Sequence, residues 1–373
     1  MFASATPSFR PRDAATVAQG AQTSATDDNA SPSIAAVAVE FPKHRHSQDV
    51  AIAELADFAG PEFHRFAAHT GVETRNFALP LPQYRDLNGF TDANNAYIDV
   101  ALELGEQALL SALDAAKVKP SEVDIIFSTT VTGIVVPSLD ARIATLIGLR
   151  PDVKRVPLFG LGCVAGAAGI ARMNDYLRAY PGQVAALLAV ELCSLTVQRE
   201  DRSIANLIAA CLFGDGAAAV IAVGGSRATA GPKLVAARSH TYPDTHEVLG
   251  WKVGSDGFGI VLSAEVAQIV EKYLGEHVRK FLAEYGMGTA DVTTWIVHAA
   301  GPKVIDAVEN ALDLPAQVLS RTRKSLRDNG NLSSVSVLDI LSGTMADPPP
   351  PGSLGLIIAM GPGFSSELVL LRW

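Results

Sequence analysis

The chain has 373 residues, of which 48% are hydrophobic and 18% are charged, and its formal net charge at pH 7 is −9. This length and apolar content suit a globular protein built of two fused halves of ordinary domain size. The negative charge argues against a nucleic-acid partner, because phosphate backbones bind to basic surfaces. No apolar run reaches the roughly 20 residues that a membrane-spanning helix needs.

The three cysteines are Cys163, Cys193 and Cys211, an odd number with irregular spacing. They fit neither a disulfide framework nor a zinc site, and no metal site is predicted. Because no signal peptide is recognisable either, we expect the protein in the reducing cytoplasm. Residues 1–32 contain Ser, Thr, Ala and Asp without periodicity, so we expect them to form a disordered tail.

From Ser33 to Val223, predicted strands alternate with predicted helices. Continuous apolar runs predict strands that are buried on both faces, and apolar residues spaced by 3.6 positions predict helices. In chain order these elements are a strand at 33–42, a helix at 97–116, a strand at 123–131, a helix at 140–149, a strand at 153–162, a helix at 164–179, a strand at 184–192, a helix at 203–213 and a strand at 217–223.

The turn-rich segment Gly224–Gly231 marks an internal boundary, after which the alternation resumes. The later elements are strands at 234–240 and 259–263, a helix at 264–285, a strand at 293–300, helices at 302–312 and 333–341, and strands at 355–360 and 367–373. We therefore predict two halves, 33–226 and 227–373, in a pseudo-duplicated, layered α/β architecture built from right-handed βαβ units.

Cys163 comes directly after a predicted strand and begins a helix of small residues, in LFGLGCVAGAAGIAR. Unpaired N–H groups at a helix N-terminus favour the thiolate over the thiol. The flanking Gly162, Ala165 and Gly166 would let a bulky acyl group approach the backbone. The alternative is a buried structural cysteine.

His298 ends a predicted strand in WIVHAA, and Pro302 begins the next helix. The carboxyl end of a buried strand is where open α/β sheets carry their chemistry. The alternative is a hydrogen-bonded core histidine.

Asn331 lies in DNGNLSSVSVL, and it could simply cap a helix, as Asn329, Ser333 or Ser334 could. Taken together, however, a Cys, a His and an Asn at three strand–helix corners form the set that acyl-thioester chemistry needs. The cysteine attacks, the histidine activates it and donates to the thioester oxygen, and the amide completes an oxyanion site.

At these residues the chain resembles the type III polyketide synthases of the chalcone and stilbene synthase superfamily, and among them the bacterial alkylpyrone and alkylresorcinol synthases. The resemblance runs from about residue 33 to the C-terminus. It rests on LGCVAGAAG, VELCSLT, LFGDGAAAV, VHAAGPKVIDAVENAL, GNLSSVSVL and AMGPGFSSE, in that order. It implies a thiolase-like αβαβα fold, a homodimer, CoA thioesters as substrates and no permanently bound cofactor.

The resemblance also implies the reaction. Cys163 would accept a starter acyl group from CoA, for which a medium or long fatty acyl group is expected. His298 and Asn331 would stabilise the enolate that forms when malonyl-CoA loses carbon dioxide. The carbanion would attack the Cys163 thioester, and the extended chain would close to an alkylpyrone or an alkylresorcinol.

Further positions are implied by the same resemblance. Phe213 matches a gatekeeper between the CoA tunnel and the cavity, with a plain core phenylalanine as the alternative, and Ile260 falls at the second gatekeeper position. Val131 and Cys193 match pocket positions that are threonines in the plant enzymes, and an apolar wall would suit an aliphatic chain. The remaining substrate-binding positions are Thr132, Thr196, Ser333, Gly361, Pro362 and Gly363.

Some positions depart from the family pattern. HPGGP is HAAGP here and GFGPG is AMGPG, both of similar size. The methionine that bridges the plant dimers is Val136, so no side chain is expected to cross between the two active sites. Arg65 and Arg75 lie in HRFAAHTGVETR, where the family places cations for the CoA phosphates.

Three other protein classes are alternatives to this assignment. A ketoacyl-ACP synthase of the priming type shares the fold and the Cys-His-Asn set, but its histidine begins an HxxN-type segment, whereas His298 leads into GPK. The α/β alternation excludes a papain-type hydrolase. The third class is a non-catalytic homologue that only binds acyl-CoA or a partner, against which the intact trio argues.

Overall fold

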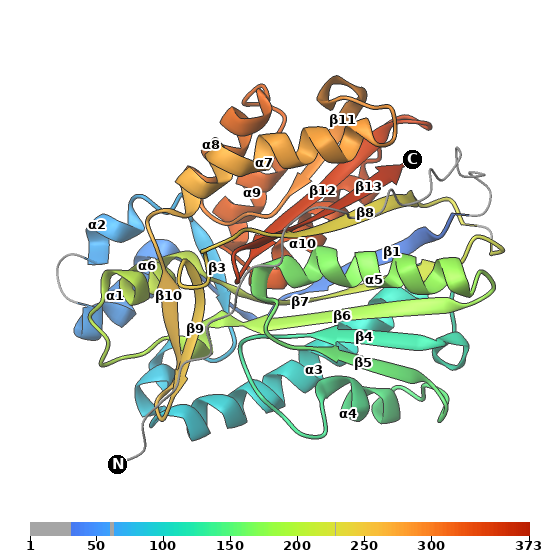
Figure 1. Cartoon of the computed structure of the whole chain (residues 1–373). Coiled ribbons are helices and arrows are strands. Elements are labelled where there is room, and N and C mark those ends of the chain that lie inside the picture. Colours follow the sequence, from blue (N-terminus) through green and yellow to red (C-terminus); the bar gives the residue numbers. More distant parts are fainter. Residues whose placement is uncertain (1–30, 60–62, 228) are drawn as a thin grey trace, which may run out of the picture.

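The computed structural model describes residues 31–59, 63–227 and 229–373 (Figure 1). The predicted disordered tail, residues 1–32, lies outside the described residues except for Ser31 and Pro32. Within the described ranges, no helix is both long enough and apolar enough to cross a membrane.

In the described part of the chain, nine strands form one mixed sheet in the order β11-β12-β13-β8-β1-β7-β6-β4-β5. Both β6 and β7 are buried along their whole length, as their continuous apolar runs predicted. The nine strands are β1 (Ser33–Glu40), β4 (Ile125–Thr129), β5 (Lys154–Leu158), β6 (Val184–Leu192), β7 (Asp215–Val223), β8 (Lys233–Thr241), β11 (Val292–Val297), β12 (Leu354–Gly361) and β13 (Ser365–Arg372).

The sheet repeats one arrangement twice. In the first half β4 is parallel to β6, β6 is antiparallel to β7, and β7 is antiparallel to β1. In the second half β11 is parallel to β12, β12 is antiparallel to β13, and β13 is antiparallel to β8. The two arrangements meet where Ser33 pairs with Lys233, and β5 is an additional edge strand of the first half. The predicted pseudo-duplication is confirmed.

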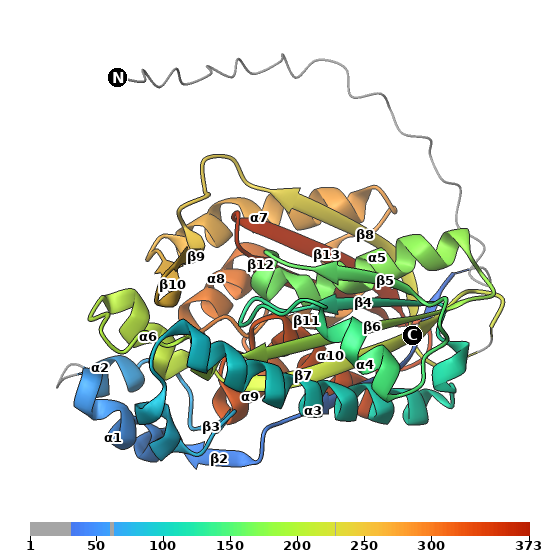
Figure 2. The same cartoon turned by 90° about the horizontal axis from the view of Figure 1, so that it is seen from below.

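The helices form three layers around these strands (Figures 1 and 2). Two of them, α5 and α10, contact strands of both halves and make the central layer. Helix α3 packs against β1, β6 and β7 from the outside, and α7 with α8 lies beyond the second-half strands. The bounds are α3 (Phe90–Ala116), α4 (Leu139–Leu146), α5 (Ala165–Ala179), α6 (Ile204–Leu212), α7 (Val266–Ala283), α8 (Pro302–Leu312), α9 (Ser320–Asn329) and α10 (Ser336–Ala346).

Side chains of β6 show how the layers are held together. Leu187 and Ala189 pack into the core that also contains residues of α5 and α10. Leu188 and Val190 point the other way, into a second core shared with α3. Because successive residues of a strand face opposite sides, an uninterrupted apolar run is what a strand between two helical layers requires.

Several elements were not predicted from the sequence. They are β2 (His44–Ser47), α1 (Gln48–Ala59), α2 (Phe63–Ala67), β3 (Thr74–Phe77), the 3₁₀ helix Leu81–Asp86, β9 (Leu249–Gly254) and α9. The hairpin of β9 with β10 (Gly257–Leu262) covers one end of the layered body, where β10 contacts α6 (Figure 1).

Candidate active site

The three corner residues lie where the central helices begin. Cys163 occupies the 3₁₀ turn Gly162–Val164 directly before α5 and is 8% exposed. Asn331 follows α9 and precedes α10, and it is 3% exposed. His298 follows β11, where its backbone N–H bonds to the carbonyl of Ile358, and it is 1% exposed.

A chain of hydrogen bonds links these corners. The Cys163 thiol lies 3.6 Å from Ser333 Oγ, and the Ser333 N–H donates to Asn331 Oδ1 at 2.8 Å. Asn331 Nδ2 donates at 3.2 Å to the carbonyl of Ala300, two residues beyond His298. The structure therefore brings Cys163, Asn331 and the loop that carries His298 into one site.

Close packing fixes the turn that holds Cys163. Gly162 has φ of +56°, and a Cβ built on it would lie 2.8 Å from Pro362 Cδ. A Cβ on Gly166 would lie 2.2 Å from the carbonyl oxygen of Ser334. The expectation that Gly162 and Gly166 leave room for an acyl group is wrong, because other parts of the protein fill that space.

His298 is available for a substrate oxygen. Neither of its ring nitrogens has a hydrogen-bond partner among the described residues. Burial lowers its pKa to about 4. A neutral imidazole offers one N–H donor, and an unpaired donor in a buried site is costly unless a ligand accepts from it.

Burial of the Cys163 thiol works against the expected thiolate, which stays a prediction. Burial raises its pKa to about 12, the nearby carboxyl of Glu191 adds to this, and the hydrogen bond to Ser333 opposes it. Desolvation thus opposes the effect that the dipole at the start of α5 is expected to have on the thiol.

Glu191 is a site residue that the sequence reasoning missed. It is fully buried and accepts from Ser334 Oγ at 2.6 Å and Ser333 Oγ at 3.3 Å on one oxygen, and from the Val131 N–H and Thr132 Oγ1, both at 3.1 Å, on the other. Burial raises its pKa to about 7. The signal was present in VAALLAVEL, because a carboxylate inside a strand buried on both faces must find partners.

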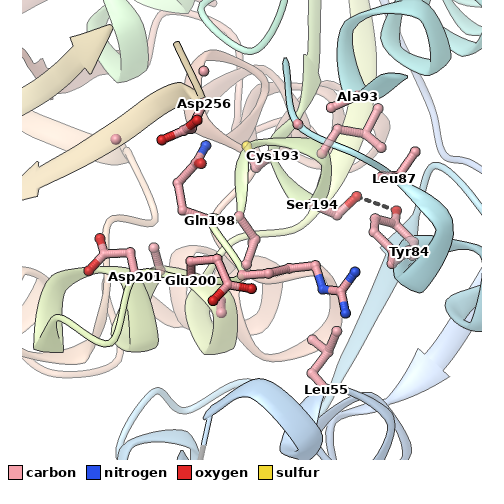
Figure 3. A pocket seen from close by; sticks show the side chains of 18 of the residues that line it. Leu55, Tyr84, Leu87, Ala93, Cys193, Ser194, Gln198, Glu200, Asp201 and Asp256 are labelled. Carbon is pink, nitrogen blue, oxygen red and sulfur yellow. Dashed lines mark hydrogen bonds between the residues drawn. The ribbon is translucent and has the colours of Figure 1, made fainter. Parts of the chain in front are cut away.

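A cavity of about 900 Å³ lies beside the site (Figure 3). Cys193 and Phe213 line it, and the backbone of Phe213 bridges to Asn331, so the cavity adjoins the trio. Ser194 and Tyr84 meet at its wall, and they join the buried Asp215, whose pKa burial raises to about 6. The charged residues that line it are Glu54, Arg75, Arg85, Arg199, Glu200, Asp201, Arg202, Lys252 and Asp256.

The remaining expected positions fall in different places. Thr132 and Thr196 line a small space that shares lining residues with the cavity. Ile260 lies in β10 opposite Trp251, and its neighbour Gly259 lines the cavity. The segment Gly361–Gly363 packs against the turn of Cys163, since a Cβ on Gly361 would lie 2.7 Å from the Val164 nitrogen.

The two arginines proposed to bind CoA differ in their exposure to solvent. Arg65 is exposed on α2, with its guanidinium over the ring of Phe66. Arg75 is 2% exposed and donates to Gln48 and to the carbonyls of Ala210 and Phe213. The Arg75 guanidinium therefore holds the end of α6 from inside. Its other amino group has no hydrogen-bond partner among the described residues, and the residue lines the cavity, so its role in CoA binding stays a prediction. No cluster of three or more metal-ligating side chains occurs in the described ranges.

Comparison with known proteins shows the family. Models of the chalcone and stilbene synthases match residues 88–226 with their N-terminal domain and 233–373 with their C-terminal domain. A 1,3,6,8-tetrahydroxynaphthalene synthase of Streptomyces peucetius subsp. caesius is 48% identical over 351 residues, which are 91% of this chain and 93% of the relative. A putative chalcone synthase of Bacillus subtilis is 34% identical over 81% of this chain and 86% of its own length.

A solved structure of the same family matches this fold. The crystal structure of 1,3,6,8-tetrahydroxynaphthalene synthase from Streptomyces coelicolor, a bacterial type III polyketide synthase, matches with a TM-score of 0.87 and 30% identity over 91% of this chain and 99% of that one. The fold and site define a thiolase-like condensing enzyme. Within that class, the chain belongs to the chalcone and stilbene synthase family and is a type III polyketide synthase. This replaces the ketoacyl-ACP synthase alternative.

Proposed function

We propose that Cys163 carries the growing polyketide as a thioester after taking an acyl group from a CoA thioester. The single observation that supports this most directly is the convergence of Cys163, Asn331 and the His298 loop on one buried site beside a large cavity. Covalent attachment splits one difficult condensation into two easier steps.

His298 and Asn331 are proposed to stabilise the enolate formed when malonyl-CoA loses carbon dioxide. Neither ring nitrogen of His298 has a partner in the described part of the chain, and Asn331 Nδ2 donates a long hydrogen bond of 3.2 Å to Ala300. Neutral donors in a dry site favour charge that develops on an oxygen during the reaction. The enolate carbon then attacks the Cys163 thioester and lengthens the chain by two carbons.

For the product, we propose a polyhydroxylated aromatic built from malonyl-CoA. The cavity wall carries charged and hydroxyl groups from five segments of the chain. Tyr84, Ser194, Glu200 and Asp201 are among them (Figure 3). A chain of alternating carbonyl groups can hydrogen-bond to these groups. The similarity to tetrahydroxynaphthalene synthases supports the same assignment.

The second candidate is the fatty acyl starter expected from the sequence, with an alkylpyrone or alkylresorcinol as product. It is favoured by Val131 and Cys193, both buried and both less polar than threonine. Each methylene buried against such a wall contributes about 0.8 kcal/mol.

The test is incubation with malonyl-CoA alone and with added acyl-CoAs of graded length, with products identified by mass. We expect a hydroxylated aromatic from malonyl-CoA alone and none from Cys163→Ala. Alkylated products formed only with a long acyl-CoA would support the second candidate. If no condensation product forms with any substrate, or if Cys163→Ala still forms product, the proposal fails.

We also propose that Arg65 binds the phosphates of CoA and that the protein is located in the cytoplasm. A further proposal is that it forms a homodimer. Ile134, Val136 and Phe159 follow the carboxyl ends of β4 and β5, and they are 42%, 88% and 57% exposed. Large apolar side chains gathered at one place suit contact with another subunit. Sedimentation velocity would show a single species near 39 kDa if the dimer is absent.

A further inference from the structure

Two hydroxyl groups on the cavity wall use their hydrogens within the wall. Tyr84 and Ser194 both line the cavity, and their side chains meet there (Figure 3). The Ser194 hydroxyl donates to Asp215 Oδ2. Because a serine hydroxyl carries one hydrogen, the hydrogen bond of 2.5 Å between Tyr84 Oη and Ser194 Oγ is donated by Tyr84. The hydrogens of both groups therefore lie along one path that ends at Asp215.

Asp215 fixes the direction of this path. The residue is fully buried, and the backbone N–H groups of Ser194 and Ala78 donate to its Oδ1 and Oδ2 at 2.8 and 2.7 Å. Burial raises its pKa to about 6, against the effect of its hydrogen bonds and of the charge on Arg75. The carboxyl is therefore ionised at neutral pH, and it accepts the hydrogen of Ser194.

The oxygen atom of Ser194 keeps room for one more hydrogen. A hydroxyl oxygen can accept two hydrogen bonds, and in the described part of the chain that of Ser194 accepts one, from Tyr84. Tyr84 Oη itself accepts from the Leu79 N–H at 3.3 Å. This part of the wall therefore presents an acceptor whose own hydrogen is turned toward Asp215. A ketone oxygen placed here would face a second acceptor, whereas an enol or phenol hydroxyl could donate to Ser194.

Apolar side chains line the cavity together with these two hydroxyl groups. The ring of Phe77 lies edge-on to the ring of Tyr84, with the centroids 6.1 Å apart. The apolar residues of the lining include Leu55, Phe77, Leu81, Leu87 and Leu195. A flat, largely apolar ligand that carries a hydroxyl group fits this lining, since its ring is removed from water while its hydrogen finds an acceptor.

We propose that Ser194 Oγ accepts a hydrogen bond from an enol or phenol hydroxyl of the chain in the cavity, and so favours the enol form of that chain over the keto form. In the enol form, one proton has moved from the carbon between two carbonyl groups to one of their oxygens. Tyr84 and Asp215 are positioning residues, because they decide where the hydrogens of the wall lie. The inference rests on the proposed function, since it takes the cavity to hold a chain of alternating carbonyl groups.

The test is calorimetric binding of naphthalene-1,3-diol and of its dimethyl ether at pH 7.5. The two probes share one ring system, and the diol alone can donate a hydrogen bond. We expect Ser194→Ala to weaken binding of the diol about fivefold, the loss expected for one neutral hydrogen bond, and to change binding of the ether by less than about twofold. Equal weakening of both probes would reveal a change of cavity shape and would overturn the inference, as would a diol that does not bind to the unmodified chain.

Tyr84→Phe is the matched control, because it removes the other hydroxyl of the same wall. Ser194 keeps its bond to Asp215 in this variant and gains a second free acceptor position. The diol should therefore bind at least as tightly as it does to the unmodified chain. A diol that is weakened by Tyr84→Phe and not by Ser194→Ala would place the contact at Tyr84 and contradict the role of Ser194.

Acidification gives a second measurement that needs no variant. A proton gained by Asp215 below pH 6 would turn to Ser194 Oγ, because backbone N–H groups face the carboxyl elsewhere, and the Ser194 hydrogen would turn away. The preference for the diol over the ether should therefore shrink between pH 7.5 and pH 5. Arg75, Tyr84 and Cys193 also face Asp215, and they keep their protons over this range, because the pKa of Arg75 is about 10 and burial raises the pKa of the other two. A preference that stayed constant with pH would overturn the inference even if Ser194→Ala does not fold.

Probe binding uses neither a CoA thioester nor the Cys163 thiol, so the two proposals fail separately. A chain that binds the diol through Ser194 but makes no polyketide overturns the proposed function alone. A chain that makes polyketide but binds both probes equally well with and without the Ser194 hydroxyl overturns the acceptor role alone.

Discussion

Gly162 and Pro362 lie against each other across the join between the two halves: a Cβ on Gly162 would be 2.8 Å from Pro362 Cδ. Gly162 also has φ of +56°, a conformation that side chains rarely adopt. Since Cys163 is the next residue, the C-terminal motif AMGPG sets the position of the nucleophile from the opposite half of the chain.

Gly162→Ala should therefore damage both stability and activity. We expect a loss of about 1–3 kcal/mol in the free energy of unfolding from the backbone conformation alone, and loss of most product formation as the turn shifts. Gly182→Ala is the control, because a Cβ there would meet nothing within 4 Å. Urea unfolding and product assays measure the two effects. An alanine variant that matched Gly182→Ala in both would show that this contact does not position Cys163.

The layered fold could be predicted because its strands are apolar on both faces. The run at 184–192 is a strand with the predicted bounds, and the helix at 302–312 also has the predicted bounds. Helix α9 was missed because SRTRKSLRDN buries only Thr322, Ser325 and Leu326, too few for a visible apolar stripe. Its position depends on neighbours that only the folded chain supplies.

The site was predictable in its residue types and not in its electrostatics. Cys163, His298 and Asn331 could be found from their places at strand–helix corners. Burial and the charge of Glu191 raise the pKa of the thiol, and the hydrogen bond to Ser333 lowers it, although both residues are distant from Cys163 in sequence. Arg75 shows the same limit, because nothing in its own segment indicates that it points inward to Ala210 and Phe213.

Glu191 should make stability depend on pH. Burial raises its folded pKa from 4.5 to about 7, so the native state holds this proton more tightly than the unfolded chain does. The stabilisation is complete below pH 4.5 and is lost as pH rises toward 7. Relative to Glu191→Gln, which does not titrate, the unmodified chain should lose roughly 3 kcal/mol at most over that window.

Urea unfolding at pH 5 and at pH 7.5 measures this difference. Glu200→Gln removes an exposed carboxylate from the cavity rim and should leave the pH dependence of the unmodified chain unchanged. If the difference in unfolding free energy between the unmodified chain and Glu191→Gln stayed constant with pH, the pKa of Glu191 would not be raised in the folded protein.

His298 should act as a neutral donor throughout the usual range of pH. Because burial lowers its pKa to about 4, the imidazole stays uncharged above pH 5. Release of carbon dioxide from malonyl-CoA should therefore show no loss near pH 6.5 on acidification. His298→Ala should slow the release by about 100-fold at every pH, the size of effect seen when an oxyanion donor is removed. An acidic limb near pH 6.5 that vanished in His298→Ala would point to a charged imidazole instead.

Substitution of Arg75 should lower stability, whereas substitution of Arg65 should weaken substrate binding. Arg75→Ala leaves the carbonyls of Ala210 and Phe213 without their buried donor, so we expect at least about 3 kcal/mol of lost stability. Arg65→Ala removes an exposed side chain and should change the free energy of unfolding by less than about 0.5 kcal/mol. It should instead raise the KM for malonyl-CoA severalfold. Equal destabilisation by both variants, or an effect on KM in Arg75→Ala alone, would contradict a structural role for Arg75 and a binding role for Arg65.

The size of the cavity should set how far the chain grows. Ala93, in the first turn of α3, lines the cavity and faces it beside Leu87 and Cys193 (Figure 3). Ala93→Phe should occupy part of the 900 Å³ and stop extension early, so that shorter lactones replace the full-length product in mass spectra. Ala115→Phe places the same side chain on the exposed face near the other end of α3 and should leave the products unchanged. If Ala93→Phe lowered the rate but kept the product masses, chain length would be set elsewhere, and the cavity would not be where the polyketide is held.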